Sequence, residues 1–105
     1  MQTFTFTTQR TEDKDQNGLR LIFQGNLTLQ NAGQIKALLK SQDIPSEHCQ
    51  IVAKDVAGMD VSFLQIVEAY KEHLRQEGKK VSVIIDLPYD LKTLMVNAGI
   101  EYPAR

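Results

Sequence analysis

Apolar and polar residues alternate near the start of the chain, and this pattern predicts two β-strands. Residues 3–8 alternate phenylalanine with threonine, which is typical of a strand with one buried face. Residues 19–24 alternate in the same way, with Leu21 and Phe23 on one face. The polar segment between them ends in Asn17-Gly18, a strong signal for a hairpin turn. The two strands are therefore expected to pair antiparallel.

Three later stretches place apolar residues three or four positions apart, which predicts amphipathic helices. The first has Thr28 as its N-cap and ends near Pro45, because proline cannot continue a helix. The second runs to about Glu77, with Gly78 as its stop, and the third begins at Pro88. The predicted buried faces are Ala32, Ile35, Leu38 and Leu39 in the first helix, Phe63, Val67, Tyr70 and Leu74 in the second, and Leu91, Leu94, Met95 and Ala98 in the third.

Two short apolar runs, residues 51–53 and 80–86, predict strands that are buried in the sheet. A tight link containing Gly58 is expected between the first of them and the second helix. The alternation of strands and helices implies parallel strands with right-handed crossovers. We therefore predict an α/β fold: a small mixed β-sheet with an antiparallel N-terminal strand and parallel βαβ units flanked by helices.

Ser62 stands just before the second helical stretch and has two interpretations. Ser62 and Gln65 match the capping box S-x-x-Q, in which the hydroxyl accepts a hydrogen bond from a backbone N–H of the first turn. Alternatively, Ser62 is a phosphorylation site, and a phosphate there adds about two negative charges. A helix N-terminus favours such a charge, whereas the nearby Asp60 repels it. The main effect of a phosphate would fall on a protein docked at this surface.

The run of residues 60–65, behind a strand and opening a helix, resembles the signature of STAS domains. This family includes bacterial anti-anti-sigma factors and domains attached to sulfate transporters. Its usual run is Asp-Ser-Ser-Gly-Leu, and the second serine is phosphorylated by a partner kinase. Asp60, Ser62 and Leu64 match that run. Val61 replaces the first serine and Phe63 replaces the glycine.

A second stretch, Gly25-Asn26-Leu27-Thr28, is similar to the family's Gly-x-Leu-Asp turn. Thr28 stands where the family often has an acid that contacts a partner or a nucleotide in some members. The alternative is an ordinary turn followed by a helix cap. The resemblance implies one STAS domain over residues 1–105. It also implies a partner-binding surface made of Asn26, Thr28, Asp60, Val61, Ser62 and Phe63.

Composition excludes several classes of function. The 105 residues carry a net charge of −1 without a basic stripe, which argues against nucleic-acid binding. Cys49 is the only cysteine, so no internal disulfide can form and a reducing, cytoplasmic setting is expected. We predict neither a signal peptide nor a membrane-inserted segment. His48 lies beside Cys49, but one further histidine, His73, does not complete a zinc site, so no metal is expected.

No motif for catalysis is present in the sequence: there is no G-x-x-x-x-G-K phosphate loop and no G-x-S-x-G elbow. An enzyme is therefore not expected, and no cofactor is predicted. Two functions stay open. In the first, the chain resembles an anti-sigma factor antagonist that binds an anti-sigma factor with serine kinase activity and is released when Ser62 is phosphorylated. In the second, it is a constitutive subunit that binds the ATPase of a lipid-transport ABC complex, or part of a chemotaxis-like signalling complex, without phosphorylation.

Overall fold

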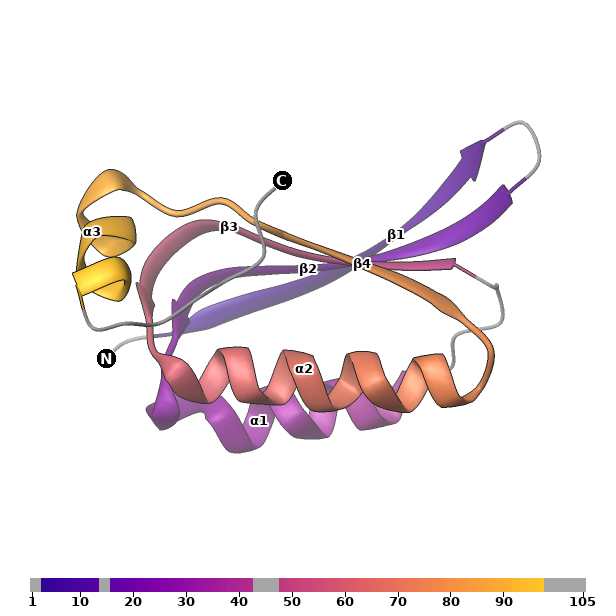
Figure 1. Cartoon of the computed structure of the whole chain (residues 1–105), viewed down its shortest axis with the longest axis horizontal. Coiled ribbons are helices and arrows are strands. Elements are labelled where there is room, and N and C mark those ends of the chain that lie inside the picture. Colours follow the sequence, from indigo (N-terminus) through magenta and orange to yellow (C-terminus); the bar gives the residue numbers. More distant parts are fainter. Residues whose placement is uncertain (1–2, 14–15, 43–47, 98–105) are drawn as a thin grey trace.

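A mixed four-stranded sheet carries two helices on one face and a third helix near one end (Figure 1). The computed structural model describes residues 3–13, 16–42 and 48–97. The strands lie side by side in chain order. The elements are β1 Phe4–Asp13, β2 Gln16–Leu27, α1 Leu29–Ser41, β3 His48–Met59, α2 Val61–Gln76, β4 Lys80–Ile85 and α3 Tyr89–Asn97.

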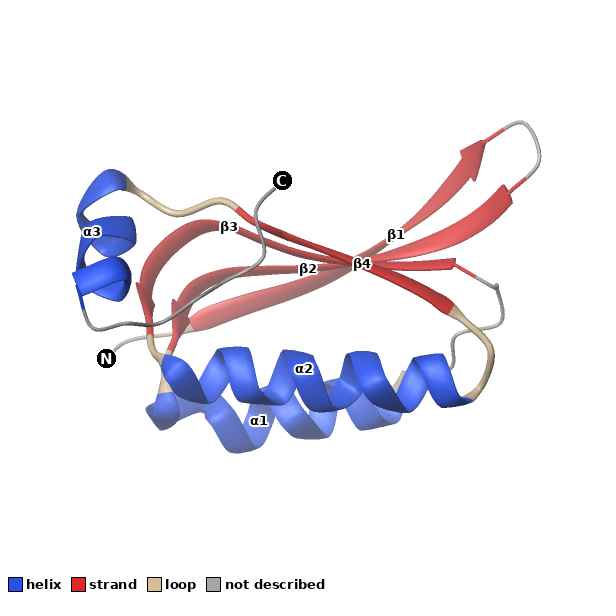
Figure 2. Cartoon of the chain, viewed as in Figure 1, coloured by secondary structure: helices blue, strands red, loops and turns tan. Residues whose placement is uncertain are grey.

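The strand directions agree with the sequence-based prediction. β1 pairs antiparallel with β2, while β2 pairs parallel with β3 and β3 parallel with β4. The β1–β2 hairpin projects beyond the rest of the sheet (Figure 2), because β2 meets the first residue of β3 only at Gly18. The predicted α/β architecture, with an antiparallel first strand followed by βαβ units, is therefore confirmed.

The turn predicted at Asn17-Gly18 is wrong. Both residues lie within β2, where they pair with Glu12 and Thr11 of β1. The polar segment continues the ladder instead of ending it, because an antiparallel pair satisfies backbone N–H and C=O groups whatever the side chains are. The last described pair joins Asp13 to Gln16. The connection itself lies outside the described residues.

The tight link predicted around Gly58 is also wrong, because β3 continues to Met59. Two irregularities in the pairing with β2 accommodate the extra length: Phe23 pairs with Ala53 and Gly25 with Val56, while Gly58 pairs with Asn26. Asp55, between the first two pairs, has a φ of 48°, in the left-handed region. Its carboxylate accepts a hydrogen bond from Gln24 Nε2 at 2.7 Å. Bulges of this kind bend a strand, and β3 curves toward its end in Figure 1.

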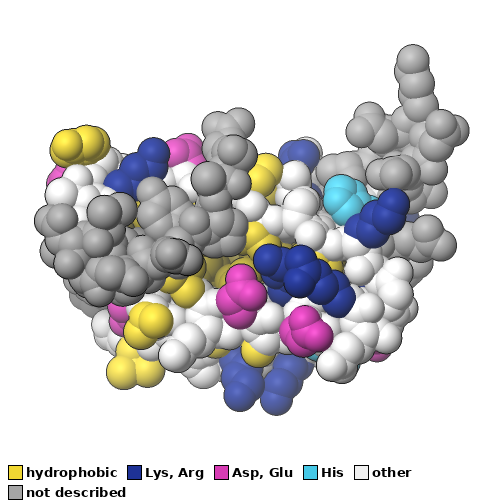
Figure 3. Space-filling view, in the orientation of Figure 1, with side chains coloured by type: hydrophobic (Ala, Val, Ile, Leu, Met, Phe, Trp, Pro, Cys, Tyr) yellow, Lys and Arg dark blue, Asp and Glu magenta, His cyan; other side chains and the backbone are white. Residues whose placement is uncertain are grey.

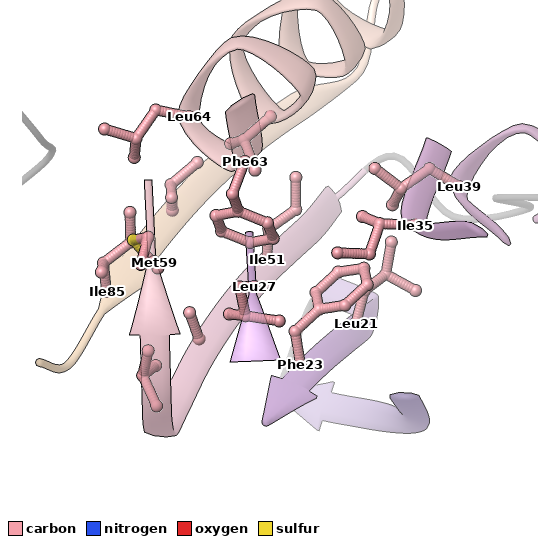
Figure 4. Packing of buried hydrophobic residues seen from close by; sticks show 14 of the residues in the cluster. Leu21, Phe23, Leu27, Ile35, Leu39, Ile51, Met59, Phe63, Leu64 and Ile85 are labelled. Atoms are coloured by element: carbon pink, nitrogen blue, oxygen red, sulfur yellow. The ribbon is translucent and has the colours of Figure 1, made fainter. Parts of the chain in front are cut away.

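The core lies between the sheet and the α1–α2 layer. Phe23 is at its centre, with its ring centroid 4.9 Å from that of Phe6 and 5.6 Å from that of Phe63. Figure 4 shows Phe63 reaching from α2 toward Leu27 and Ile51 of the sheet. The largest fully buried side chains are Leu21, Phe23, Leu27, Ile35, Leu39, Cys49, Ile51, Phe63 and Val67.

The predicted helix faces are confirmed where the structure describes them. Ile35 and Leu39 of α1 are buried, and Ala32 and Leu38 are half-buried. In α2, Phe63, Val67 and Leu74 are buried and Tyr70 is half-buried. In α3, Leu91 packs against the core. The side chains of Leu94 and Met95, and Ala98, lie outside the described residues.

Backbone hydrogen bonds cap the C-terminal end of α2. Gly78 has a φ of +80°, which glycine adopts without steric cost. Its N–H donates to Arg75 O at 2.9 Å, and the N–H of Lys79 donates to Leu74 O at 3.0 Å. These two bonds form a Schellman motif, as the predicted stop at Gly78 requires. The C-cap of α1 is Gln42, and Pro45, predicted to end that helix, lies outside the described residues. Over the described ranges, no helix has the length and apolar character needed to cross a membrane.

Candidate functional site

The two helices of the α1–α2 layer begin at the same edge of the sheet. β2 and β3 are parallel neighbours, so the helices that follow them start side by side (Figure 1). We call Thr28, Leu29, Asp60, Val61 and Ser62 the helix-start edge. The carboxyl edge of parallel strands is where α/β proteins commonly place their binding sites.

Asp60 forms hydrogen bonds with both helices at this edge. Its Oδ1 accepts a hydrogen bond from the N–H of Ser62 at 3.0 Å, and its Oδ2 accepts one from the N–H of Leu29 at 2.9 Å. The first N–H groups of a helix have no partner inside the helix, and their partial positive charge favours a carboxylate. One side chain therefore satisfies a backbone donor in each of two helices.

The capping box predicted at Ser62 and Gln65 is wrong. The N-cap of α2 is Asp60, and Ser62 is the second residue of the helix. Aspartate is as good an N-cap as serine, and this one also reaches the second helix. Thr28 is the N-cap of α1, as predicted, but in the described part of the chain its side chain makes no capping bond. The first N–H of α1, that of Leu29, donates to Asp60.

Ser62 is half-buried. Within the described residues, no hydrogen bond involves its hydroxyl, while the neighbouring Phe63 ring is 1% exposed and faces the sheet. The large side chain that replaces the family's glycine therefore does not cover the hydroxyl. Leu29 and Val61, by contrast, are 70% and 46% exposed. Figure 3 shows hydrophobic surface, at the lower left, over the starts of α1 and α2.

Beneath the edge lies a pair of buried asparagines. Asn26 is 3% exposed and Asn31 is 8% exposed, and Asn31 Nδ2 donates to Asn26 O at 2.8 Å. The Asn26 Nδ2 group has no hydrogen-bond partner among the described residues. A Cβ at Gly58 would come within 2.8 Å of Asn26 Oδ1, so only glycine fits against this side chain without a shift. Asn26 therefore contacts both α1, through Asn31, and β3, at Gly58.

The six residues predicted to bind a partner thus fall into two groups. Asp60, Val61, Ser62 and Thr28 come together on the helix-start edge, and Asn26 and Phe63 lie under it. Sequence reasoning missed Leu29. It is an apolar residue off the buried face of its helix, and that mismatch could have identified it.

A groove with a volume of about 810 Å³ runs between α1 and α2, and Ser62 lies at its start. Its walls contain the half-buried residues Ala32, Ile66 and Tyr70, and the core residues Leu39 and Leu74 also line it. The lining residues are Leu29, Ala32, Lys36, Leu39, Lys40, Gln42, Ser62, Gln65, Ile66, Ala69, Tyr70, His73, Leu74, Glu77 and Lys79.

Two weak acids lie toward the far end of this groove. Burial raises the pKa of the Cys49 thiol from 9.0 to about 11, and the positive charge of Lys79 opposes that rise. Burial also raises the pKa of Tyr70 from 10.0 to about 12, with smaller contributions from Cys49 and Glu77. Both groups are therefore neutral near pH 7, and a protonated thiol is a poor nucleophile. His48 and Cys49 are the first residues of β3, and in the described ranges no three His, Cys, Asp or Glu residues gather as a metal site.

The mixed sheet and its helix layer have the STAS-domain fold. The chain is similar to the crystal structure of an anti-sigma factor antagonist STAS domain from Rhodobacter sphaeroides, with a TM-score of 0.62 and 18% sequence identity. The match covers 77% of this chain and 85% of that one. The fold implied by the sequence resemblance is therefore confirmed.

A second solved structure is an uncharacterised protein with a SpoIIAA-like fold from Shewanella loihica. Its TM-score is 0.47 at 15% identity, over 100% of this chain and 85% of that one. No protein-family model and no curated protein matches the sequence.

Proposed function

We propose that the chain is a non-catalytic binding module that docks a partner protein on the helix-start edge and is switched by phosphorylation of Ser62. The partner is an anti-sigma factor with serine kinase activity, so the chain acts as an anti-sigma factor antagonist. The observation that carries the proposal is the placement of Ser62. Its hydroxyl is without a hydrogen bond in the described structure, and two exposed apolar side chains, Leu29 and Val61, stand beside it.

The switch follows from the contacts of Asp60. A phosphate on Ser62 adds about two negative charges within two residues of the Asp60 carboxylate. It also competes with that carboxylate for the N–H groups of Ser62 and Leu29. A docked partner would then face a desolvated dianion, at a cost of about 2–4 kcal/mol, which lowers affinity by roughly 30- to 1000-fold.

The test is a kinase assay with a candidate serine kinase of the anti-sigma type. The protein is incubated with that kinase and ATP, and its mass is measured. We expect one added phosphate in the wild type, none in Ser62→Ala, and one in the matched control Ser41→Ala, because Ser41 is an exposed serine outside the edge. A phosphate that persists in Ser62→Ala, or none in the wild type, contradicts the switch.

A second function has support from the same edge. The exposed Leu29 and Val61 side chains are suited to a permanent hydrophobic contact, as in a constitutive subunit bound to the ATPase of a lipid-transport ABC complex. Phe63 does not contribute to such a contact, because it is buried. Co-purification distinguishes the two: a constitutive subunit stays bound to the ATPase in wild type and Ser62→Ala alike, and loses it in Leu29→Glu.

A further inference from the structure

The groove between α1 and α2 is long and open rather than enclosed. It extends from Leu29 and Ser62 at the helix starts to Lys40 and Glu77 near the helix ends. The 13 residues of α1 span about 20 Å, at 1.5 Å per residue. Several lining side chains are exposed along its length, including Gln65, Ala69 and His73. A small ligand would be buried poorly here, whereas a helix of three to four turns would lie along the whole groove.

The spacing of the lining residues fits a helical occupant. In α1 the groove is lined at positions 29, 32, 36, 39 and 40, and in α2 at positions 62, 65, 66, 69, 70, 73 and 74. These positions recur every three to four residues, so they lie along one side of each helix. The two ridges therefore run side by side, and Ala32, Ile66 and Ala69 supply apolar surface on them. A third helix can set its own apolar ridge into such a groove.

The charge at the groove is asymmetric. Lys36 and Lys40 stand one turn apart on the α1 side, and α1 has no acidic residue. Within the described ranges neither lysine forms an ion pair. On the α2 side, by contrast, His73 Nε2 lies 3.8 Å from Glu77 Oε2. Figure 3 shows Lys or Arg side chains at the lower border of the molecule. The side of an occupant that faces α1 must therefore carry negative charge to match.

We infer that this groove binds an amphipathic α-helix of a partner protein, with acidic residues three or four positions apart on the flank that faces α1. The inference deepens the proposed function by giving the chemistry of the partner segment, and it rests on that function for its link to Ser62. Ser62 is at the start of the groove, so a phosphate there lies beside the bound helix and repels its acidic flank.

The test is a selection from a displayed library of helical peptides of about 14 residues, the length that fills the groove. We expect enriched peptides to be amphipathic, with paired acids beside the apolar stripe. Ala69→Arg places a long side chain in the groove at an exposed helical position, and should weaken binding of these peptides at least tenfold. Gln76→Arg, on the same helix but outside the groove, is the matched control and should leave binding unchanged.

A second variant keeps the test valid if Ala69→Arg fails to fold. Lys36→Glu with Lys40→Glu changes only exposed side chains, and should weaken the acidic peptides about tenfold while favouring basic ones. Three results overturn the inference: no enrichment, enriched peptides that are basic or extended, and peptides that bind Ala69→Arg as well as the wild type. A concentration-dependent dimer that Ala69→Arg abolishes also overturns it, since the groove would then be covered by a second copy.

The two proposals fail separately. If no kinase modifies Ser62 but acidic helical peptides bind the wild type and not Ala69→Arg, the phosphorylation switch is wrong and the groove remains a binding site. If Ser62 is phosphorylated but no helix is selected at the groove, the inference alone is wrong.

Discussion

The helix ends at the two sides of the α1–α2 layer are capped by different kinds of hydrogen bond. At the C-terminal end, α2 is capped by backbone hydrogen bonds from Gly78 and Lys79 to carbonyls of its own last turn. At its N-terminal end one carboxylate, Asp60, serves both helices. The first arrangement is local and needs no neighbour. The second joins two elements through a single side chain, so a charge placed beside it acts on both helices at once. This difference supports the position of the switch proposed above.

The largest expected effect tests how the start of α2 is anchored. Phe63→Ala removes a ring that is 1% exposed and in contact with Phe23, so it leaves a cavity in the core. We expect a loss of about 3–5 kcal/mol in the free energy of unfolding, measured by urea denaturation. A loss below about 1 kcal/mol would mean that the ring is not buried, and that the family's glycine position is not an anchor in this chain.

Breaking the junction itself should have the next largest effect. Asp60→Ala leaves the N–H groups of Ser62 and Leu29 without their acceptor, and we expect a loss of about 2–4 kcal/mol in the free energy of unfolding. Gly78→Ala, at the self-closed end, should cost only about 1 kcal/mol, through its positive φ.

Amide chemical shifts provide the sharper measurement. Asp60→Ala should move resonances in the first turns of both helices, whereas Gly78→Ala should move only those around the end of α2. Equal spread from both variants would remove the contrast between the two ends.

Alkaline pH should weaken the far end of the layer. The pKa values of Cys49 and Tyr70 are raised in the folded state, so the folded chain holds these protons more tightly than the unfolded chain does. This stabilisation is complete below pH 9.0 and is lost as pH rises toward about 11 for Cys49 and about 12 for Tyr70.

The loss from Cys49 alone approaches about 1.4 kcal/mol per pH unit in that window. Urea denaturation across alkaline pH measures it, and Cys49→Ala should reduce the slope to the contribution of Tyr70. An unchanged slope in Cys49→Ala would show that the thiol does not titrate with folding.

The smallest expected effect concerns Thr28. An N-cap threonine usually contributes about 1 kcal/mol through its hydroxyl, but within the described residues the Thr28 side chain makes no capping hydrogen bond. Thr28→Ala should therefore change the free energy of unfolding by less than about 0.5 kcal/mol. A cost near 1 kcal/mol would indicate that the hydroxyl caps α1 after all.

Periodicity alone predicted the order of elements and the buried faces of both helices in the layer. It worked because residues such as Ile35, Phe63 and Val67 contact one sheet along one side of each helix. It failed where pairing extends through polar residues, at Asn17-Gly18, and where Asp55 adopts a left-handed conformation that lets β3 continue.

The candidate site was predicted in part. The signature at residues 60–65 and its link to Ser62 follow from the sequence, but the role of Asp60 as a shared cap does not. The bond to Leu29 spans 31 positions, beyond the reach of any local pattern. Cap propensity could not decide between Asp60 and Ser62 as the N-cap of α2, because Asp and Ser are nearly equivalent caps and both stand at the start of the helix. The hydrogen bond from Asn31 Nδ2 to Asn26 O depends on the burial of two polar residues, which the sequence pattern does not predict.

The distance in sequence between Leu29 and Asp60 also sets an order of events during folding. Their hydrogen bond cannot form until β3 has docked beside β2, because each residue follows one of those strands. A chain that has made only the β1–β2 hairpin and α1 does not present the completed edge. A protein that binds this edge therefore recognises the finished fold, and it distinguishes mature molecules from those still assembling.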